Sequence, residues 1–302
     1  MKKELGLLGL GRMGMNMVKR LLEDHHKISV YNRTYQKCQE VSVLGAQPFQ
    51  KIEDLVSNLP SPRVCWQMLP AGIVTEEIFS TLVGLLNQGD ILLEGGNSRY
   101  QDSQRRAKIC QEKGIRFLDV GVSGGIWGLE IGYCLMIGGD SSAYEELIPV
   151  FKSLAPPEGF SYMGPAGSGH YVKMIHNGIE YGMMEAYAEG FELLKAKEEF
   201  DLPLQEIARL WNQGSVVRSW LLELLERQVL NETSLSKIKG YVEDSGEGRW
   251  TVETALDLKV PAEVITTSLM KRFSSRQEDS FAAKVLAGLR YAFGGHTFKE
   301  DK

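Results

Sequence analysis

The chain has 302 residues, which is long enough for two domains because single hydrophobic cores rarely grow beyond roughly 250 to 300 residues. Hydrophobic residues make up 43% and charged residues 24%, so we expect an ordinary globular protein without dominant disorder. The net charge of -5 gives no basic field for a nucleic-acid backbone. No window approaches the ~20 apolar residues of a membrane span. Neither a nucleic acid nor a membrane is therefore expected as a partner.

The cysteines and the N-terminus indicate the cytoplasm. Cys38, Cys65, Cys110 and Cys134 lie far apart and form no CxxC pair, so neither a zinc site nor a disulfide framework is indicated. The N-terminus runs directly into a short apolar strand and lacks the longer apolar stretch of a signal peptide. We expect a cytoplasmic protein without a metal site.

Strand and helix patterns alternate over the first half of the chain. The expected strands cover residues 5–10, 28–31, 64–68, 91–94 and 117–120, and the expected helices cover 13–22, 75–86 and 102–113. Such alternation predicts parallel βαβ units in an open, doubly wound α/β sheet, which we assign to residues 1–165.

After the turn signal at residues 163–167, the strand pattern disappears and helical patterns take over. The first expected helix covers 168–197, roughly 45 Å at 1.5 Å per residue, and the others cover 203–213, 219–229, 251–258, 261–273 and 279–291. We expect residues 166–302 to form an all-α helical domain. The cleft between the two domains is the expected active site.

Residues 9–14 read G-x-G-x-x-G after a strand and at the start of a helix, which is typical of a Rossmann-type dinucleotide site. Its glycines would let backbone amides approach a pyrophosphate at the positive end of the helix. The second strand is followed by Asn32, Arg33 and Thr34, not by the acid that binds the ribose 2'-hydroxyl of NAD. A guanidinium and a hydroxyl suit a 2'-phosphate, so NADP is favoured, unless Arg33 is only a solvated loop charge.

A helix over 168–197 would carry Lys173, His176, Asn177, Glu180 and Tyr181 at i, i+3, i+4, i+7 and i+8. That spacing normally defines an apolar face, and a solvated face would be rich in Glu, Lys and Gln. An amine, an imidazole, an amide, a carboxyl and a phenol can instead move protons and hold an oxygen-rich substrate. The pattern favours a catalytic face.

Together, these motifs resemble those of the decarboxylating 6-phosphogluconate dehydrogenases of the β-hydroxyacid dehydrogenase superfamily. The resemblance runs nearly from end to end, through residues 9–17, 32–34, 70–72, 95–98, 119–125, 173–181 and 290–296. The runs over 173–181 and 293–297 are the most specific to this family. The chain resembles the short branch, which is often NAD-preferring, although its residues 32–34 are of the NADP type.

The resemblance implies roles for individual residues. Lys173 would take the 3-hydroxyl proton while hydride leaves C3, and would then act as an acid while carbon dioxide leaves. Glu180 would protonate C1 of the enediol to give ribulose 5-phosphate, and Asn177 completes the implied catalytic set. The implied substrate-binding residues are Asn97, Ser123, Gly124, Gly125, His176, Asn177, Tyr181, Arg272, Arg290 and His296. The implied cofactor-binding residues are Gly9, Gly11, Arg12, Met13, Gly14, Asn32, Arg33, Thr34, Leu69, Pro70, Ala71 and Asn97.

Tyr181 and Arg272 would meet the substrate phosphate. Arg290 and His296 would reach the same site from a partner subunit, so the resemblance implies a homodimer or homotetramer. Residues 243–250 are shorter than the corresponding long-form loop, which carries a phosphate-binding lysine, and Arg249 is the candidate substitute.

Several alternatives remain open. Asn97 and Ser98 could cap the following helix, residues 123–125 could be a structural turn, and residues 290–296 could be a frayed terminus. The chain could also be a non-decarboxylating β-hydroxyacid dehydrogenase of the 3-hydroxyisobutyrate or tartronate-semialdehyde type, or a catalytically silent dinucleotide-binding regulator. Glu180 and Arg272 argue against the non-decarboxylating dehydrogenase, and Lys173 with Asn177 argues against the silent regulator.

Overall fold

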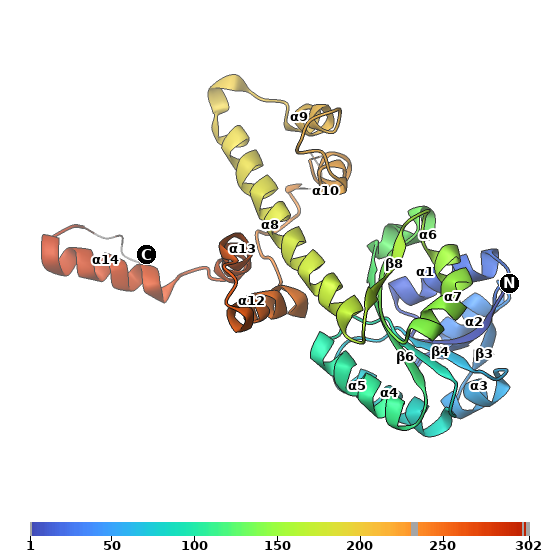
Figure 1. Ribbon diagram of the computed structural model, residues 1–302. Coiled ribbons are helices and arrows are strands. Elements are labelled where there is room, and N and C mark those ends of the chain that lie inside the picture. Colours follow the sequence, from blue (N-terminus) through green and yellow to red (C-terminus); the bar gives the residue numbers. More distant parts are fainter. Residues whose placement is uncertain (1, 231–234, 298, 300–302) are drawn as a thin grey trace. The chain divides into compact units, whose positions relative to one another are not determined.

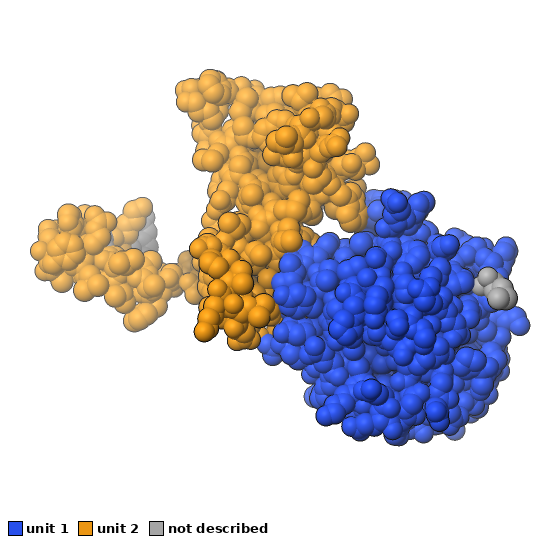
Figure 2. Space-filling model, in the orientation of Figure 1, with its two compact units in different colours: residues 1–176 blue, residues 177–302 orange. Residues whose placement is uncertain are grey.

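The computed structural model describes residues 2–230, 235–297 and 299. The chain forms two compact units, residues 1–176 and 177–302 (Figure 2). The division predicted after residue 165 lies in the turn that precedes the long helix and stays a prediction. In the part of the chain that the structure describes, no helix is both long and apolar enough to cross a membrane.

Unit 1 contains one eight-stranded sheet (Figure 1). Its strands are β1 (Glu4–Leu8), β2 (Lys27–Tyr31), β3 (Gln47–Phe49), β4 (Val64–Gln67), β5 (Ile91–Glu94), β6 (Arg116–Ser123), β7 (Cys134–Gly139) and β8 (Phe160–Gly164). Their order in the sheet is β3-β2-β1-β4-β5-β6-β7-β8. The order reverses between β1 and β4, so a crevice is expected beyond the carboxyl ends of these two strands.

The parallel pairing predicted from the sequence holds from β3 to β6. It is wrong at β7, which runs antiparallel to β6, and β8 then pairs in parallel with β7. Residues 124–133 connect β6 to β7 and are too few for the crossover that parallel neighbours require.

Helices cover both faces of the sheet because successive strand residues point to opposite sides. Leu5 and Leu7 pack in one cluster with α1 (Arg12–Glu23), α2 (Gln36–Ser42) and α7 (Ser141–Leu154). Leu8 packs in the other cluster with α3 (Ile52–Asn58), α4 (Ile73–Leu85) and α5 (Tyr100–Glu112). The prediction of a doubly wound sheet is therefore confirmed.

The long helix α8 (Ser168–Ala196) begins in unit 1 and continues into unit 2. The described part of unit 2 is helical, as predicted. It contains η2 (Glu198–Phe200), α9 (Leu204–Trp211), α10 (Trp220–Leu224), η3 (Leu225–Val229), α12 (Gly246–Leu258), α13 (Glu263–Ser274) and α14 (Phe281–Gly294). The single helix predicted over 219–229 is instead a short α-helix followed by a π-helical turn.

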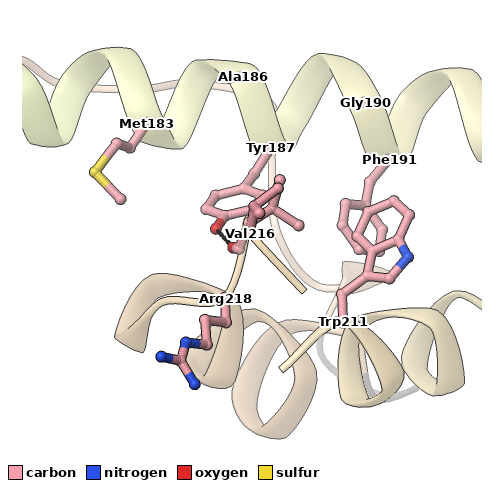
Figure 3. A pocket seen from close by; sticks show the side chains of 9 residues that line it. Met183, Ala186, Tyr187, Gly190, Phe191, Trp211, Val216 and Arg218 are labelled. Atoms are coloured by element: carbon pink, nitrogen blue, oxygen red, sulfur yellow. Dashed lines mark hydrogen bonds between the residues drawn. The ribbon is translucent and has the colours of Figure 1, made fainter. Parts of the chain in front are cut away.

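An apolar pocket of about 330 Å³ opens in unit 2 between α8 and the segment after α9 (Figure 3). Tyr187 and Phe191 reach into it from α8, Trp211 lines it from α9, and Arg218 lies at its edge. The Tyr187 hydroxyl donates to the carbonyl oxygen of Val217. None of the predicted site residues lines this pocket.

All four cysteines lie within the described residues and all are free thiols. Cys38, Cys65 and Cys110 are buried in unit 1, whereas Cys134 at the start of β7 is exposed. Burial raises the pKa of the Cys65 and Cys110 thiols to about 12. These thiols are therefore protonated at neutral pH.

Candidate active site

A pocket of about 450 Å³ lies at the carboxyl ends of β1, β2 and β4, where the strand order reverses. Its lining includes seven of the predicted cofactor-binding residues, namely Gly9, Gly11, Asn32, Arg33, Thr34, Leu69 and Pro70. Arg12, Met13 and Gly14 occupy the first turn of α1, and Ala71 follows Pro70, so these four lie beside the lining. The pocket also contains Lys37 and Glu77, which were not predicted.

The three fingerprint glycines meet different surroundings. Gly9 has φ +105°, and a Cβ there would lie 2.4 Å from the carbonyl oxygen of Met68. A Cβ at Gly14 would lie 2.1 Å from the carbonyl oxygen of Gly9, so close packing excludes a side chain at both positions. A Cβ at Gly11 would meet nothing within 4 Å. Gly11 thus leaves open space at the start of α1, where a pyrophosphate would bind.

The end of β2 combines a structural amide with two cations. Asn32 Oδ1 accepts from the backbone N–H of Leu10 at 2.9 Å, so this side chain orders the glycine loop. Lys37 Nζ donates to the carbonyl oxygen of Leu10 at 3.3 Å, and Arg33 is exposed. Both cations line the pocket, and its one lining carboxylate in the described structure, Glu77, comes from α4 and not from β2. The residues present fit a phosphorylated ribose.

Glycines allow the start of α8 to pack directly on the sheet. A Cβ at Gly121 of β6 would lie 2.4 Å from the Cβ of Lys173, and a Cβ at Gly169 would lie 2.4 Å from the carbonyl oxygen of Asp119. Lys173 is held against β6 and is 6% exposed. Its side chain is therefore largely withdrawn from bulk water.

Ser123 and His176, two of the residues expected to bind substrate, meet in unit 1; their role stays a prediction. Ser123 Oγ lies 3.3 Å from His176 Nε2, at the end of β6. Gly124 follows with φ +132° and Gly125 with φ +53°, so a turn is also present. The capping alternative for Asn97 and Ser98 is wrong, because Arg99 occupies the N-cap of α5 and no side chain caps it.

Tyr181 and Arg272 come together in unit 2. The Arg272 guanidinium lies 3.4 Å from the centroid of the Tyr181 ring. The Tyr181 hydroxyl accepts from the backbone N–H of Ser245 at 2.7 Å, and Arg272 donates to the carbonyl oxygen of Glu243 at 3.0 Å. Nearby, Asn177 Nδ2 donates to the buried carboxylate of Glu247 at 3.1 Å. The Arg272 guanidinium beside the Tyr181 hydroxyl suits an anion such as a phosphate, whereas the Glu247 carboxylate next to Asn177 does not.

Comparisons with known proteins match both parts of the chain to one family. Residues 4–164 match the NAD binding domain of 6-phosphogluconate dehydrogenase, and residues 169–301 match the C-terminal domain of 6-phosphogluconate dehydrogenase. The chain belongs to the 6-phosphogluconate dehydrogenase family. The resemblance seen in the sequence is thus confirmed, and with it the assignment of the chain to the oxidoreductases.

Similar proteins of this family include both short and long chains. The Bacillus subtilis protein YqeC, named provisionally as a 6-phosphogluconate dehydrogenase, is 46% identical over 97% of this chain and 98% of its own. An NAD(+)-dependent, decarboxylating 6-phosphogluconate dehydrogenase of Haloferax volcanii is 43% identical over 97% of each chain. The solved 6-phosphogluconate dehydrogenase of Plasmodium falciparum, described with NADP+ and with 6-phosphogluconate, is 31% identical with a TM-score of 0.83. It aligns with 99% of this chain, which spans 66% of that longer one.

In this member of the 6-phosphogluconate dehydrogenase family, Arg249 is already paired. Asp244 accepts from Arg249 and from Arg276, each at 2.5 Å. The hydrogen bond from Arg249, followed by that from Arg276, lowers the pKa of Asp244 to about 2. Asp244 and Arg276 were not predicted as site residues. Because the carboxylate engages both guanidinium groups, Arg249 is a weaker substitute for the long-form lysine than its sequence position indicates.

The last predicted residues of this family member lie in and after α14. Arg290 belongs to the helix, whereas His296 lies beyond its end, and both are exposed. The ring centroid of His296 lies 6.2 Å from that of Phe293. The backbone of Arg290 is helical, whereas that of His296 is not. The role of both residues at a partner's site stays a prediction.

Proposed function

We propose that the protein oxidises 6-phosphogluconate with NADP or NAD and releases carbon dioxide, giving ribulose 5-phosphate in the cytoplasm. The observation that carries this proposal is the unbroken helix α8, which holds Lys173 and Tyr181 eight residues apart. At 1.5 Å per residue this separation is about 12 Å. It is comparable to the length of an extended, phosphorylated six-carbon acid. Asn177 and Glu180 lie between its two ends on the same helix face.

The chemistry follows from the groups along this face. Lys173 Nζ takes the proton of the 3-hydroxyl while C3 gives up hydride, and bound NADP supplies the acceptor for that hydride. The resulting 3-keto acid loses its C1 carboxylate as carbon dioxide, and the bonding pair moves toward the keto oxygen. Lys173 returns its proton to this oxygen, which gives an enediol. In the five-carbon enediol the former C2 is C1 and the former C3 is C2. Glu180 then protonates C1, and loss of the hydroxyl proton at C2 completes the ketose.

A phosphorylated substrate is favoured by Tyr181 and Arg272. The guanidinium stacks on the ring, which fixes it without a carboxylate partner among the contacts described. An Arg group held in this way keeps its donors other than the one bound to Glu243 for an anion. The smaller β-hydroxyacids of the alternative dehydrogenases carry no phosphate and have no need of this pair.

NADP is the proposed preferred cofactor. Arg33 and Lys37 place two cations at the pocket's ribose end, and no carboxylate follows β2 directly. The relative from Haloferax volcanii is named as NAD(+)-dependent, so NAD is the competing cofactor.

The deciding experiment mixes the protein with 6-phosphogluconate and either NADP or NAD, then follows nicotinamide reduction together with carbon dioxide release. We expect both to proceed in equal amounts. Reduction without carbon dioxide would contradict the decarboxylation and favour a simple β-hydroxyacid dehydrogenase. No reduction with 6-phosphogluconate or smaller β-hydroxyacids would favour the silent regulator.

A further inference from the structure

A buried carboxylate lies at each end of β5. Asp90 immediately precedes the strand and is 2% exposed, and Glu94 is its last residue and is fully buried. Each pairs with an arginine, Arg63 for Asp90 and Arg106 for Glu94. In parallel α/β sheets, ligands bind beyond the carboxyl ends of the strands. Glu94 lies at that end, whereas Asp90 lies at the opposite end.

Glu94 controls the loop that follows β5. Its Oε1 accepts from Arg106 and from the hydroxyl of Ser98, and its Oε2 accepts from Ser103 Oγ at 3.2 Å. Ser98 directly follows Asn97, so this hydrogen bond fixes the backbone beside the predicted ligand-binding amide. A Cβ at Gly96 would lie 2.1 Å from the carbonyl oxygen of Leu69, so the same loop packs on the cofactor pocket.

The same network continues into the start of α8. Ser103 Oγ lies 2.7 Å from Nδ1 of His170, which is one helical turn before Lys173. The backbone N–H of His170 donates to Asp119 Oδ2 at 2.8 Å, and that of Gly167 donates to Asp119 Oδ1 at 2.7 Å. Ser103, His170 and Asp119 are all buried. The beginning of α8 is thus tied to the end of β5 and to the middle of β6.

We propose that Glu94 is a positioning residue that holds Asn97 and the Lys173 turn of α8 in register for hydride transfer. This inference rests on the function proposed above. Within unit 1, Glu94 is the group that joins the loop after β5 to α5 and, through Ser103, to α8. A glutamine there has nearly the same shape but no charge, so Arg106 loses its fully buried anionic partner and keeps only the partly exposed Glu76. The neutral amide also binds the hydroxyls of Ser98 and Ser103 less strongly than the carboxylate does, so we expect the loop after β5 to shift.

Glu94→Gln and Asp90→Asn form a matched pair, because each neutralises a buried, arginine-paired carboxylate on the same strand. The measurements are the melting temperature, the dissociation constant for NADP, and kcat and KM for 6-phosphogluconate. We expect both variants to melt at a lower temperature. Glu94→Gln alone should lower kcat about tenfold or more, because small misplacements of reacting groups cost up to ~100-fold. It should also weaken NADP binding several-fold while KM changes less than kcat.

Equal kcat and NADP affinity in the two variants, at similar melting temperatures, would overturn the proposal. If the wild-type protein does not turn over 6-phosphogluconate, the proposed function fails, and the NADP dissociation constants of the two variants alone decide the role of Glu94. If Glu94→Gln does not fold, Ser103→Ala replaces it, since it removes only the link to α8. That variant should lose turnover about tenfold and keep NADP affinity within about twofold; unchanged turnover would contradict the proposal.

Discussion

Several features of this site depend on side chains that are absent, namely the Cβ atoms of two glycines and an acidic residue after β2. Lys173 lies against β6 because Gly121 has no Cβ, and the start of α1 stays open because Gly11 has none. Arg33 is exposed at the mouth of the cofactor pocket, where no acid follows β2. Lys173 and Arg33 can therefore be changed one at a time, the first to test the chemical step and the second to test the choice of cofactor.

Lys173→Ala should abolish most turnover while leaving cofactor binding intact. A positioned general base contributes about 10²- to 10⁴-fold to rate, so kcat should fall by that range. The NADP dissociation constant, measured by fluorescence titration, should stay within about twofold because Lys173 does not line the cofactor pocket. Lys152→Ala, at an exposed position of α7, serves as the control. Near-normal turnover in Lys173→Ala would disprove its role as the base.

Arg33→Asp should shift the preference from NADP toward NAD. The carboxylate repels a 2'-phosphate and can accept from a 2'-hydroxyl, so kcat/KM should fall for NADP and rise relative to it for NAD. Lys51→Asp makes the same change of charge at an exposed position outside the pocket. If both variants show the same ratio of kcat/KM values as the wild type, Arg33 takes no part in cofactor choice.

At the scale of elements, some turns of α8 pack tightly against a neighbouring helix, and others have open space beside them. A Cβ at Gly178 would lie 2.6 Å from Cγ2 of Thr251 on α12, whereas a Cβ at Gly190 would meet nothing within 4 Å. Both glycines lie inside the part of α8 that belongs to unit 2. Alanine substitutions at these two glycines therefore separate the free-energy cost of tight packing from the effect of helix propensity.

Gly178→Ala should destabilise the protein and Gly190→Ala should stabilise it. The first forces α8 and α12 apart, at a cost of about 1 to 3 kcal/mol for an overpacked contact. The second gains roughly 0.5 to 1 kcal/mol because alanine is the better helix former. Urea unfolding of both variants beside the wild type measures the two signs. Equal shifts would show that α12 gives way without cost.

Much of the fold could be predicted because interior strands are continuous apolar runs. The strand over Ile91–Glu94 was predicted with its observed bounds, and the long helix ends one residue before its predicted end. The strand β3 was missed because it is only three residues long and contains Pro48. The direction of β7 depends on the length of its connection and not on its own residues.

The site residues also divide into those that local sequence patterns reveal and those that only the fold brings together. The glycine fingerprint and the polar face of α8 are local patterns, so sequence spacing revealed them. The groups around Glu94 and Asp244 were missed because their partners follow no regular spacing, from four residues for Ser98 and Glu94 to 67 residues for Ser103 and His170. Only tertiary packing brings such residues together. For Glu94 the sequence did contain a signal, because an acidic residue ends an otherwise apolar strand.

At the scale of the whole molecule, α14 carries an apolar surface that a single chain leaves uncovered. None of its residues is buried, and Phe281, Leu286, Leu289 and Phe293 are all exposed. Covering a large apolar side chain contributes about 1.5 to 3 kcal/mol. We propose that this helix contributes to the homodimer or homotetramer implied by the resemblance.

The oligomer should depend on this helix. Sedimentation velocity of the wild-type protein should show a dimer or tetramer, and the double variant Leu286→Glu with Leu289→Glu should sediment as a monomer, because buried unpaired carboxylates are strongly disfavoured. Val43→Glu with Leu44→Glu places the same charges on exposed apolar residues of unit 1 and should leave the assembly unchanged. A wild-type monomer at all concentrations would contradict the proposal.

The distribution of thiols gives the folded chain a built-in chemical reporter. The thiolate is the reactive form of cysteine, so exposed Cys134 should react quickly with an aromatic disulfide reagent while Cys38, Cys65 and Cys110 react only when unit 1 opens. A titration should therefore show one fast thiol in the native protein and four in denaturant. Four fast thiols without denaturant would contradict the burial described above. Once Cys134 is blocked, the rate of the remaining slow thiol reaction measures how often unit 1 opens. Added NADP should lower this rate.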